Sequence, residues 1–420
     1  MSKLFFKMLR SLIIPKTDFV FKSANDLNIG LDEKKFDLYI HIPFCKNRCY
    51  FCPYNTMKYD QNLVPKLFNS LRTEVNIIMK KQPEILFNSV YIGGGTPTLV
   101  LDELVDFLDW LKARATILGE VAIETNPDDI DEIKFLKLRE VGVNLVSIGV
   151  QSFNDKILNF LGRSYNSINL LQKISMVKKI GFEHVNIDLM WTPEIQSLDE
   201  FKQDLDMAIA SETNQITAYP LFKFPHSNAG FKANLKKVKM PLLRKRRKFY
   251  KFFHEKLLQE DFRRVSVWGF SRNSRLKYSS VTRPKHLGIG PGAASRLNSG
   301  FFFNTFNFES YCDRIKSGMA PTSLHLEMTE NLHKIYDVYW KYYETSVPTQ
   351  YLDNIDNRLF KMIIKTLNII GMQKKIADDY VLTEKGAFWV HLLQNYYILS
   401  YIENVWSISM QQPFPEEIRL

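Results

Sequence analysis

The sequence has few cysteines and no long apolar segment. Only four of its 420 residues are cysteine, which excludes a disulfide framework and predicts a reducing, cytoplasmic location. A membrane-spanning helix needs about 18 or more uncharged apolar residues, and no window provides them. The nearest, residues 387–406, is interrupted by four polar or charged residues, namely His391, Gln394, Asn395 and Glu403. The sequence also lacks low-complexity segments and internal repeats.

The first 15 residues are apolar but carry Lys3, Lys7 and Arg10. These charges break the uninterrupted apolar core that a signal peptide requires. We expect the segment to pack on the protein itself, and a short amphipathic helix lying on a membrane surface is the alternative.

Length and charge indicate a large globular chain with an excess of basic residues. A chain of 420 residues that is 45% hydrophobic can bury a large core, and we expect two domains. The formal net charge of +11 favours anionic partners such as carboxylated small molecules, acidic proteins, nucleic acid or membrane surfaces. A genome that favours lysine codons produces the same excess, so charge alone identifies no partner.

Three of the four cysteines, Cys45, Cys49 and Cys52, lie within eight residues. The spacing Cys-x3-Cys-x2-Cys lets each thiolate bind one iron of a cubane [4Fe–4S] cluster and leaves the fourth iron open to a small molecule. A closed zinc site needs a fourth ligand close by, whereas Pro53 follows the motif and Cys312 is distant in sequence. Zinc, or three buried thiols, are the alternatives to the cluster.

The cysteines and the preceding run Tyr39-Ile-His-Ile-Pro-Phe resemble the signature of radical S-adenosylmethionine (SAM) enzymes. More narrowly, they resemble the oxygen-independent coproporphyrinogen III oxidase branch, which includes related haem chaperones. The resemblance runs from about residue 39 to 305, and more weakly to the C-terminus. It implies a [4Fe–4S] cluster on the three cysteines, one or two SAM molecules, and a reducing electron-donor protein as partner. In this superfamily SAM is cleaved to methionine and a 5′-deoxyadenosyl radical.

Strand and helix patterns alternate along the first half of the chain. Apolar or alternating runs at 38–42, 89–92, 121–125, 145–150, 184–189 and 215–219 are separated by segments with helical periodicity, such as 64–80, 101–113 and 168–179. Six repeats predict an α/β fold with a parallel sheet, read as a partial (β/α)6 TIM-like radical SAM barrel, as the resemblance also implies. The cysteine loop and the glycine run both follow strands, at the end where such barrels place their chemistry.

The rest of the chain predicts further units. The expected domains are an N-terminal extension (1–35), the barrel (36–230), a barrel-completing and linker region (231–325) and a C-terminal helical, winged-helix-like α+β domain (326–420). Residues 361–386 read as a helix, two short strands and the start of another helix. Alone, such a segment suggests DNA binding, but with the cluster motif upstream we expect a substrate lid or a packing role and no nucleic acid. The basic stretch 232–251 predicts a helix with either a solvated face or an anion-binding surface.

The glycine run at 91–98 contains Gly94, Gly95 and Thr96. Glycines allow close backbone approach to a ligand, although a tight turn explains such a run as well. Glu124 ends the third predicted strand, where its carboxylate can pair with a ligand ammonium or act as an ordinary acid at a helix N-terminus. The resemblance implies that Glu124, the glycine run and Tyr39 hold a first SAM molecule.

The same resemblance implies that Gln151, Arg163 and Asp188 contact SAM and are associated with a second molecule, and that Phe51 lies against that molecule. From the residues alone, Gln151 and Asp188 are polar side chains at strand ends, where a barrel site needs them.

Substrate signatures of the branch are missing. After Asp188 the chain continues Met190-Trp-Thr-Pro-Glu in place of a glycine turn, and residues 1–36 lack the Pro-Arg-Tyr-Thr-Ser-Tyr-Pro stretch of coproporphyrinogen oxidases. The segment from Tyr278 lacks the His-Asn-x-x-Tyr-Trp motif of the haem chaperones. We therefore predict methyl transfer or another two-SAM reaction on a specialised small molecule, anionic or a tetrapyrrole. Oxidative decarboxylation of coproporphyrinogen III in haem biosynthesis, and haem binding and delivery without decarboxylase activity, are the alternatives.

Overall fold

The computed structural model describes residues 19–24, 31, 33–222, 243–272, 278–279, 283–353, 355 and 358–419, without the side chains of 359–360 and 396–403. The apolar N-terminal segment, whose packing the sequence predicts, lies outside the described residues. So does most of the basic stretch before residue 243.

Six parallel strands form the centre of the main sheet, and their order in space is their order in the chain. Both faces of each strand are mostly buried, which explains why the sequence shows them as apolar runs. The third strand has the predicted bounds, and the other five match the prediction to within a few residues. They are β2 (Lys35–Ile42), β5 (Leu86–Gly94), β7 (Val121–Thr125), β8 (Leu145–Gln151), β9 (His184–Trp191) and β10 (Gln215–Pro220).

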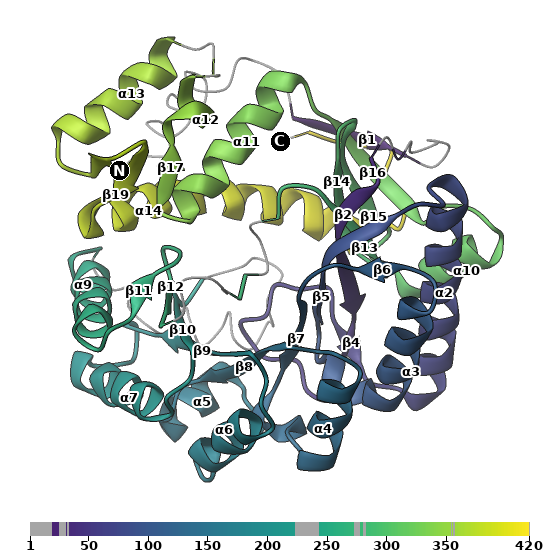
Figure 1. Cartoon of the computed structure of the whole chain (residues 1–420), viewed down its shortest axis with the longest axis horizontal. Coiled ribbons are helices and arrows are strands. Elements are labelled where there is room, and N and C mark those ends of the chain that lie inside the picture. Colours follow the sequence, from purple (N-terminus) through teal and green to yellow (C-terminus); the bar gives the residue numbers. More distant parts are fainter. Residues whose placement is uncertain are drawn as a thin grey trace.

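At least one helix follows each of β5, β7, β8 and β9 and covers the outside of the sheet, as Figure 1 shows. The helix predicted from residue 168 begins two residues later, because Asn169 has a left-handed backbone, with φ of 65°. The outer helices are α2 (Val64–Lys81), α3 (Leu101–Lys112), α4 (Glu132–Glu140), α5 (Asp155–Leu161), α6 (Leu170–Lys179) and α7 (Leu198–Ala210).

The six strands do not close into a ring in the part of the chain that the structure describes. Beyond β10 the sheet continues antiparallel through β12 (Gly269–Ser271) and β11 (Arg263–Arg264). Beyond β2 it continues through β13 (His286–Ile289), which is parallel to β2, and then through antiparallel strands. The predicted partial barrel is therefore confirmed. The antiparallel strands are β14 (Ala294–Leu297), β15 (Gly300–Asn304), β16 (Thr322–Glu327), β1 (Val20–Ser23) and β20 (Glu417–Arg419).

Two further helices, α9 (Leu243–Gln259) and α10 (Phe308–Lys316), pack beside α7 and α2 respectively. In Figure 1 the C-terminal elements lie on the side of the arc that the barrel leaves open, between α9 and the β13–β16 strands. The predicted helix, two strands and following helix are all present, and a third strand joins them to form a small winged-helix-like sheet. The elements are α11 (Glu330–Tyr343), β17 (Ser346–Pro348), α12 (Thr349–Asp353), α13 (Arg358–Ile369), β18 (Gln373–Ile376), β19 (Asp379–Leu382) and α14 (Glu384–Tyr401).

The division into domains stays a prediction. β1, from the expected N-terminal extension, pairs with both β16 and β20, and these strands continue the sheet of the barrel, so segments from all four expected units share one sheet.

Candidate functional site

The three clustered cysteines lie on a loop at the carboxyl end of β2. The loop opens with the short strand β3 (Phe44–Cys45), which pairs with β4 (Met57–Lys58) as the chain returns. A turn brings the backbone N–H of Cys52 to the carbonyl of Cys49, 3.3 Å away. All three cysteine residues are partly exposed, so an incoming group can reach the loop.

The loop is fixed from one side by the end of α5. The backbone N–H of Tyr50 donates to the carbonyl of Leu161 at 3.1 Å. Gly162 follows with φ of 71°, and a Cβ at this residue would lie 2.7 Å from the Tyr50 ring. Only glycine satisfies both the left-handed backbone and the close contact.

The glycine run fixes the loop from another side. The N–H of Gly95 donates to the carbonyl of Ile42, and the N–H of Thr96 donates to the carbonyl of Phe44, both at 2.8 Å. A Cβ on Gly95 would lie 2.4 Å from that Phe44 oxygen. The run therefore supports the cysteine loop through its own backbone, a role that the sequence pattern alone did not reveal.

Side chains from the ends of β5, β7 and α5 connect two of the cysteine sulfurs. The Thr96 hydroxyl lies 3.7 Å from the Cys45 sulfur, and Asn126 donates to the Thr96 oxygen at 2.8 Å. Arg163 donates to Asn126 at 2.6 Å and to the Cys49 sulfur at 2.9 Å. Asn126 was not among the predicted site residues, and its position directly after β7 was the signal that could have found it.

Arg163 is held in a rigid position. It also donates to the carbonyl of Gly149 at 2.7 Å and to the Tyr165 hydroxyl at 2.9 Å, and its guanidinium lies 4.7 Å from the centre of the Tyr165 ring. Loss of hydration lowers the pKa of Arg163, but Tyr165 and Cys49 more than offset this, so the net pKa is raised and the cation persists.

Glu124 lies at the centre of a second polar cluster. It accepts hydrogen bonds from the Tyr91 hydroxyl and, at 3.3 Å, from the N–H of Gly94. Tyr278 in turn donates to the Tyr91 hydroxyl at 2.5 Å. Loss of hydration inside the barrel raises the pKa of Glu124 to about 7. A carboxyl group with this pKa readily ionises when a cation binds beside it.

Tyr39 and its neighbour on β2 lie against this cluster. The Tyr39 hydroxyl bonds the Nδ1 atom of His41 at 2.7 Å, and the ring centres of Tyr39 and Tyr91 are 6.0 Å apart. The other ring nitrogen of His41 bonds the carbonyl of Asn55 at 2.8 Å. Burial lowers the pKa of His41 to about 4, so the ring is neutral and ties β2 to the end of the cysteine loop.

The remaining predicted residues lie on the following strands. Asp188 accepts from Ser147 at 2.8 Å and from Asn186 at 3.0 Å, and loss of hydration raises its pKa to about 6. Gln151 ends β8 with φ of 65°. Phe51 packs into an apolar cluster that reaches Met190 and Leu221 from β9 and the end of β10.

The burial pattern along the six strands shows which surface these residues share. Each strand is buried over most of its length, yet near its carboxyl end one or two residues remain partly exposed. These residues are Tyr39, Gly94, Glu124, Gly149, Gln151, Asp188 and Tyr219. Five of the seven are predicted site residues, and Gly149 and Tyr219 are additions. They define one solvent-accessible surface beside the cysteine loop.

The residues present fit a [4Fe–4S] cluster with SAM beside it. In the described part of the chain, no three His, Cys, Asp or Glu side chains gather around a position for a single metal ion. A cubane does not require this, because each cysteine binds a different iron. Burial raises the pKa of the Cys45 thiol to about 11 and that of the Cys52 thiol to about 12. Both are protonated before the cluster binds, so its binding releases protons.

Comparison with known proteins agrees with the geometry. The Radical SAM superfamily model matches residues 39–208, which begin at Tyr39 and include all three cysteines. Residues 39–208 of this chain form a radical SAM domain. The haem chaperone HemW of Bacillus subtilis is 27% identical over 360 residues, which cover 83% of this chain and 88% of that protein.

Two further relatives belong to the same branch. Coproporphyrinogen III oxidase, anaerobic 1, of Cereibacter sphaeroides is 26% identical over 314 residues, 70% of this chain and 69% of that protein. The solved coproporphyrinogen III oxidase HemN of Escherichia coli superposes with a TM-score of 0.75 at 19% identity, covering 91% of this chain and 94% of that one. The predicted resemblance and fold class are thus confirmed.

The segment 190–194, which lacks the glycine turn of the branch, begins inside β9. Trp191, the last residue of that strand, is buried, with its indole N–H donating to the carbonyl of Ala218 at 3.2 Å. Its ring stacks on Phe249 of α9, with the ring centres 6.0 Å apart. Trp191 therefore anchors α9 to the end of β9.

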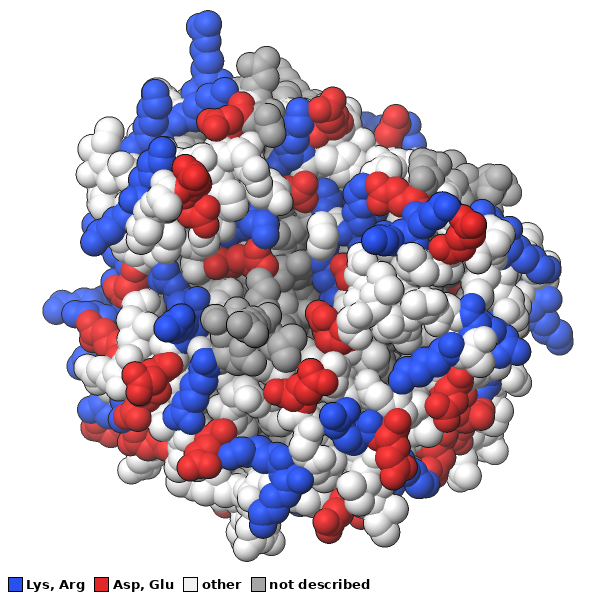
Figure 2. Space-filling model, viewed as in Figure 1, with Lys and Arg blue, Asp and Glu red and all other residues white. Residues whose placement is uncertain are grey.

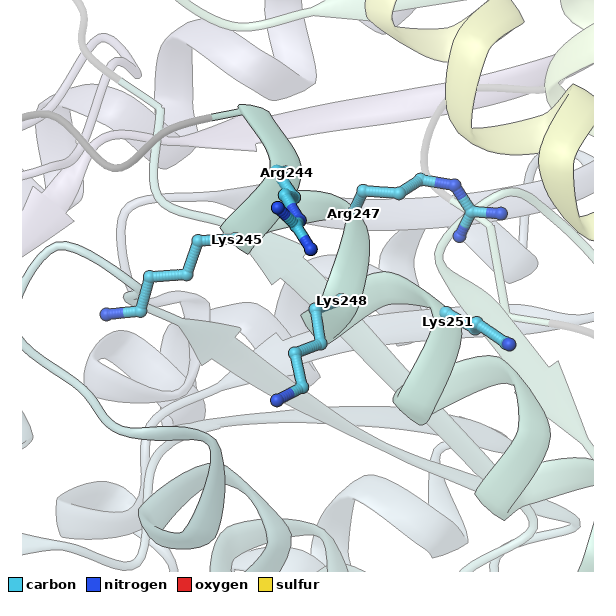
Figure 3. Close-up of a pocket in the computed structure, with 5 residues that line it drawn as sticks. All are labelled: Arg244, Lys245, Arg247, Lys248 and Lys251. Atoms are coloured by element: carbon cyan, nitrogen blue, oxygen red, sulfur yellow. The ribbon is translucent and has the colours of Figure 1, made fainter.

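From residue 243 on, the basic stretch forms the predicted helix, and three of its cations attach α9 to neighbouring segments. Lys245 donates to the carbonyl of Gln196 at 3.2 Å, Arg246 donates to that of Leu221 at 2.8 Å, and Arg247 forms an ion pair with Glu384. Figure 3 shows the side chains that border a shallow groove of about 460 Å³ on this helix, and anion binding there stays a prediction. They are Arg244, Lys245, Arg247, Lys248 and Lys251.

Charge of both signs is mixed over the face of the molecule seen in Figure 2, where basic and acidic side chains lie among one another. The net charge of +11 therefore does not produce a single broad basic surface on that face. Among the helices that the structure describes, none is long and apolar enough to cross a membrane.

Glu124→Gln and Asp188→Asn are expected to weaken SAM binding without removal of the cluster. Each variant loses a charge-assisted contact, worth about 1.5–3 kcal/mol or roughly ten- to a hundredfold in affinity. Calorimetry on the reconstituted protein measures this, with Glu132→Gln on the exposed first turn of α4 as the control. Wild-type affinity in both variants would show that these two carboxylates do not touch SAM.

SAM affinity is also expected to depend on pH. The raised pKa of Glu124, about 7, means that the carboxyl is largely protonated at pH 6 and ionised at pH 8. Because the ammonium of SAM favours the ionised form, affinity rises with pH up to about 7, by at most about tenfold per unit, and then levels off. Glu124→Gln should flatten this part of the profile, whereas an unchanged profile would assign the dependence to another group.

Proposed function

We propose that Cys45, Cys49 and Cys52 hold a [4Fe–4S] cluster whose open iron binds SAM. When bound, the cluster supplies the electron that cleaves SAM to methionine and a 5′-deoxyadenosyl radical. The observation that carries this proposal is the series of hydrogen bonds from Cys45 through Thr96, Asn126 and Arg163 to Cys49. Its members come from the ends of β5, β7 and α5 and meet at the cysteine loop. A structural zinc loop or three unrelated thiols would not require such a series.

The other residues of the solvent-accessible surface position the ligand. We propose that Glu124 pairs with the SAM ammonium and that the glycine run and Tyr39 line the same side. Asp188, with Ser147 and Asn186 holding it in place, offers a second carboxylate to hydroxyl or ammonium groups. Gln151, Arg163 and Phe51 would face a second SAM molecule, as the family resemblance implies.

We propose a tetrapyrrole as the molecule on which the chain acts or which it carries, with haem ranked first. Support comes from two relatives that span most of the chain, one named as a haem chaperone and the other as a coproporphyrinogen III oxidase. Methyl transfer, which the missing substrate motifs favoured in the sequence, has less support than either tetrapyrrole function. The winged-helix-like part would then form one wall of the site, since Tyr343 of α11 hydrogen-bonds Tyr219 on the shared surface.

The proposal requires a one-electron donor and a reducing location. An exposed cluster and free thiols survive in a cytoplasm-like redox environment, and the low potential of such clusters requires a reduced protein or flavin as donor.

The proposed function is tested by anaerobic assays on one preparation. With reductant and SAM we expect 5′-deoxyadenosine and methionine, and haem titration should give a saturable change in the visible spectrum. With added coproporphyrinogen III we expect little protoporphyrinogen, because residues 1–36 lack the substrate-recognition stretch of the oxidases.

Other results of these assays would reverse parts of the proposal. Robust protoporphyrinogen formation would make the chain a decarboxylase, and transfer of label from the SAM methyl group to a product would support methyl transfer. A reconstituted cluster with no SAM cleavage would contradict the radical chemistry itself.

A further inference from the structure

Asn126 uses both the oxygen and the nitrogen of its side-chain amide in the series of hydrogen bonds that connects Cys45 with Cys49. Its Oδ1 atom accepts from Arg163 at 2.6 Å, and its Nδ2 atom donates to the Thr96 oxygen at 2.8 Å. A guanidinium has only donors, so the oxygen must face Arg163 and the NH₂ group must face Thr96. The orientation of the amide is therefore determined by its partners.

That orientation directs the Thr96 hydroxyl. The Thr96 oxygen already accepts from Asn126, and the nearest acceptor for its own proton is the Cys45 sulfur at 3.7 Å. Thr96 is 2% exposed, so little water competes for this proton. Without Asn126, the hydroxyl would be free to rotate toward other acceptors.

The same amide also fixes the donor to Cys49. Arg163 is held by Asn126, by the carbonyl of Gly149 and by Tyr165, and this leaves Nη1 pointing at the Cys49 sulfur at 2.9 Å. Asn126 thus supports side-chain donors to two of the three cysteine sulfurs. The third, Cys52, accepts instead from the backbone N–H of Tyr54, which no side-chain substitution removes.

We propose that Asn126 is a positioning residue that raises the reduction potential of the cluster through Thr96 and Arg163, an inference that rests on the proposed function. Reduction adds negative charge that is shared with the cysteine sulfurs, and hydrogen bonds to those sulfurs stabilise the reduced state more than the oxidised one. Removal of the donors therefore lowers the potential, so that the external donor reduces the cluster less readily.

The test is a potentiometric titration, monitored by electron paramagnetic resonance, of the anaerobically reconstituted full chain without SAM. In Asn126→Ala we expect reduction to become about tenfold less favourable, which is about 59 mV for one electron. Thr96→Val, which removes one hydroxyl at constant shape, should lower the potential by a smaller amount. Thr96→Ser keeps the hydroxyl and should restore it.

Asn144→Ala is the matched control. The side chain of Asn144 accepts a hydrogen bond from the backbone N–H of Val121 at 2.8 Å. Val121 begins β7, whereas Asn126 directly follows its last residue. Its loss disturbs β7 to a similar degree but touches no cysteine, so the potential should equal that of the wild type.

The outcomes separate this inference from the function on which it rests. A wild-type chain that forms no [4Fe–4S] cluster overturns the proposed function and this inference together. A normal wild-type cluster whose potential is unchanged in Asn126→Ala overturns this inference alone. If Asn126→Ala fails to assemble a cluster, Thr96→Val tests the inference in its place. An unchanged reduction potential in Thr96→Val also contradicts a role for the hydrogen bonds to the cysteine sulfurs.

Discussion

A variant in which Cys45, Cys49 and Cys52 are all alanine is expected to lose the [4Fe–4S] cluster and all reductive cleavage of SAM. These three are the clustered thiols of the sequence, and iron–sulfur clusters are held by thiolates. Iron and sulfide content should fall from about four of each per chain to background, and 5′-deoxyadenosine should no longer form. Both measurements are made after anaerobic reconstitution.

Cys312→Ala is the control for this variant. Cys312 is buried on α10, away from the cysteine loop, and packs in the main hydrophobic core. Its loss should leave cluster content and SAM cleavage intact. A stable cluster in the triple variant, or loss of the cluster in Cys312→Ala, would place the ligands elsewhere.

Gly95→Ala is expected to reduce cluster content severely, although residue 95 touches no cysteine sulfur. Its Cβ would lie 2.4 Å from the carbonyl oxygen of Phe44, which is backbone and cannot rotate away. The strand end and the cysteine loop must separate, which breaks the bonds from Gly95 and Thr96 to the loop. Overpacking of this kind costs about 1–3 kcal/mol, and here the displaced segment carries Cys45.

Gly318→Ala separates backbone strain from this steric effect. Gly318 has φ of 73° but nothing within 4 Å of the position of a Cβ, so alanine there is strained without a clash. We expect a stability loss of about 1–2 kcal/mol with full cluster content. Thermal unfolding together with iron analysis tests both variants, and a fully loaded Gly95→Ala protein would contradict the support role of the glycine run.

The strands of the barrel could be predicted from the sequence, because a strand of a parallel sheet that is buried on both faces consists of a nearly continuous apolar run. Val121–Thr125 reads as an apolar run that ends at polar residues, and the strand has those bounds. The helix boundaries were less certain, since a single left-handed residue, Asn169, delays the start of α6. The pairing of β1 with β20 was unpredictable, because neither short segment carries a signal of its distant partner.

The site was only partly predictable, because contacts between distant segments leave no signal in the local sequence. The cysteines, the glycine run and Glu124 are recognisable one motif at a time. The bonds among Thr96, Asn126 and Arg163 depend on β5, β7 and β8 lying side by side, which no local pattern encodes. Likewise, the basic stretch revealed a helix, but not that Arg247 would pair with Glu384, 137 residues away.

The most direct test of the account is the electron paramagnetic resonance spectrum of the reduced cluster before and after SAM is added. Three cysteine ligands leave one iron open, so binding of SAM at that iron should change the spectrum. The change should be absent when S-adenosylmethionine is replaced by a molecule without its amino and carboxylate groups. A spectrum that stays the same at saturating SAM would contradict an open cluster on Cys45, Cys49 and Cys52.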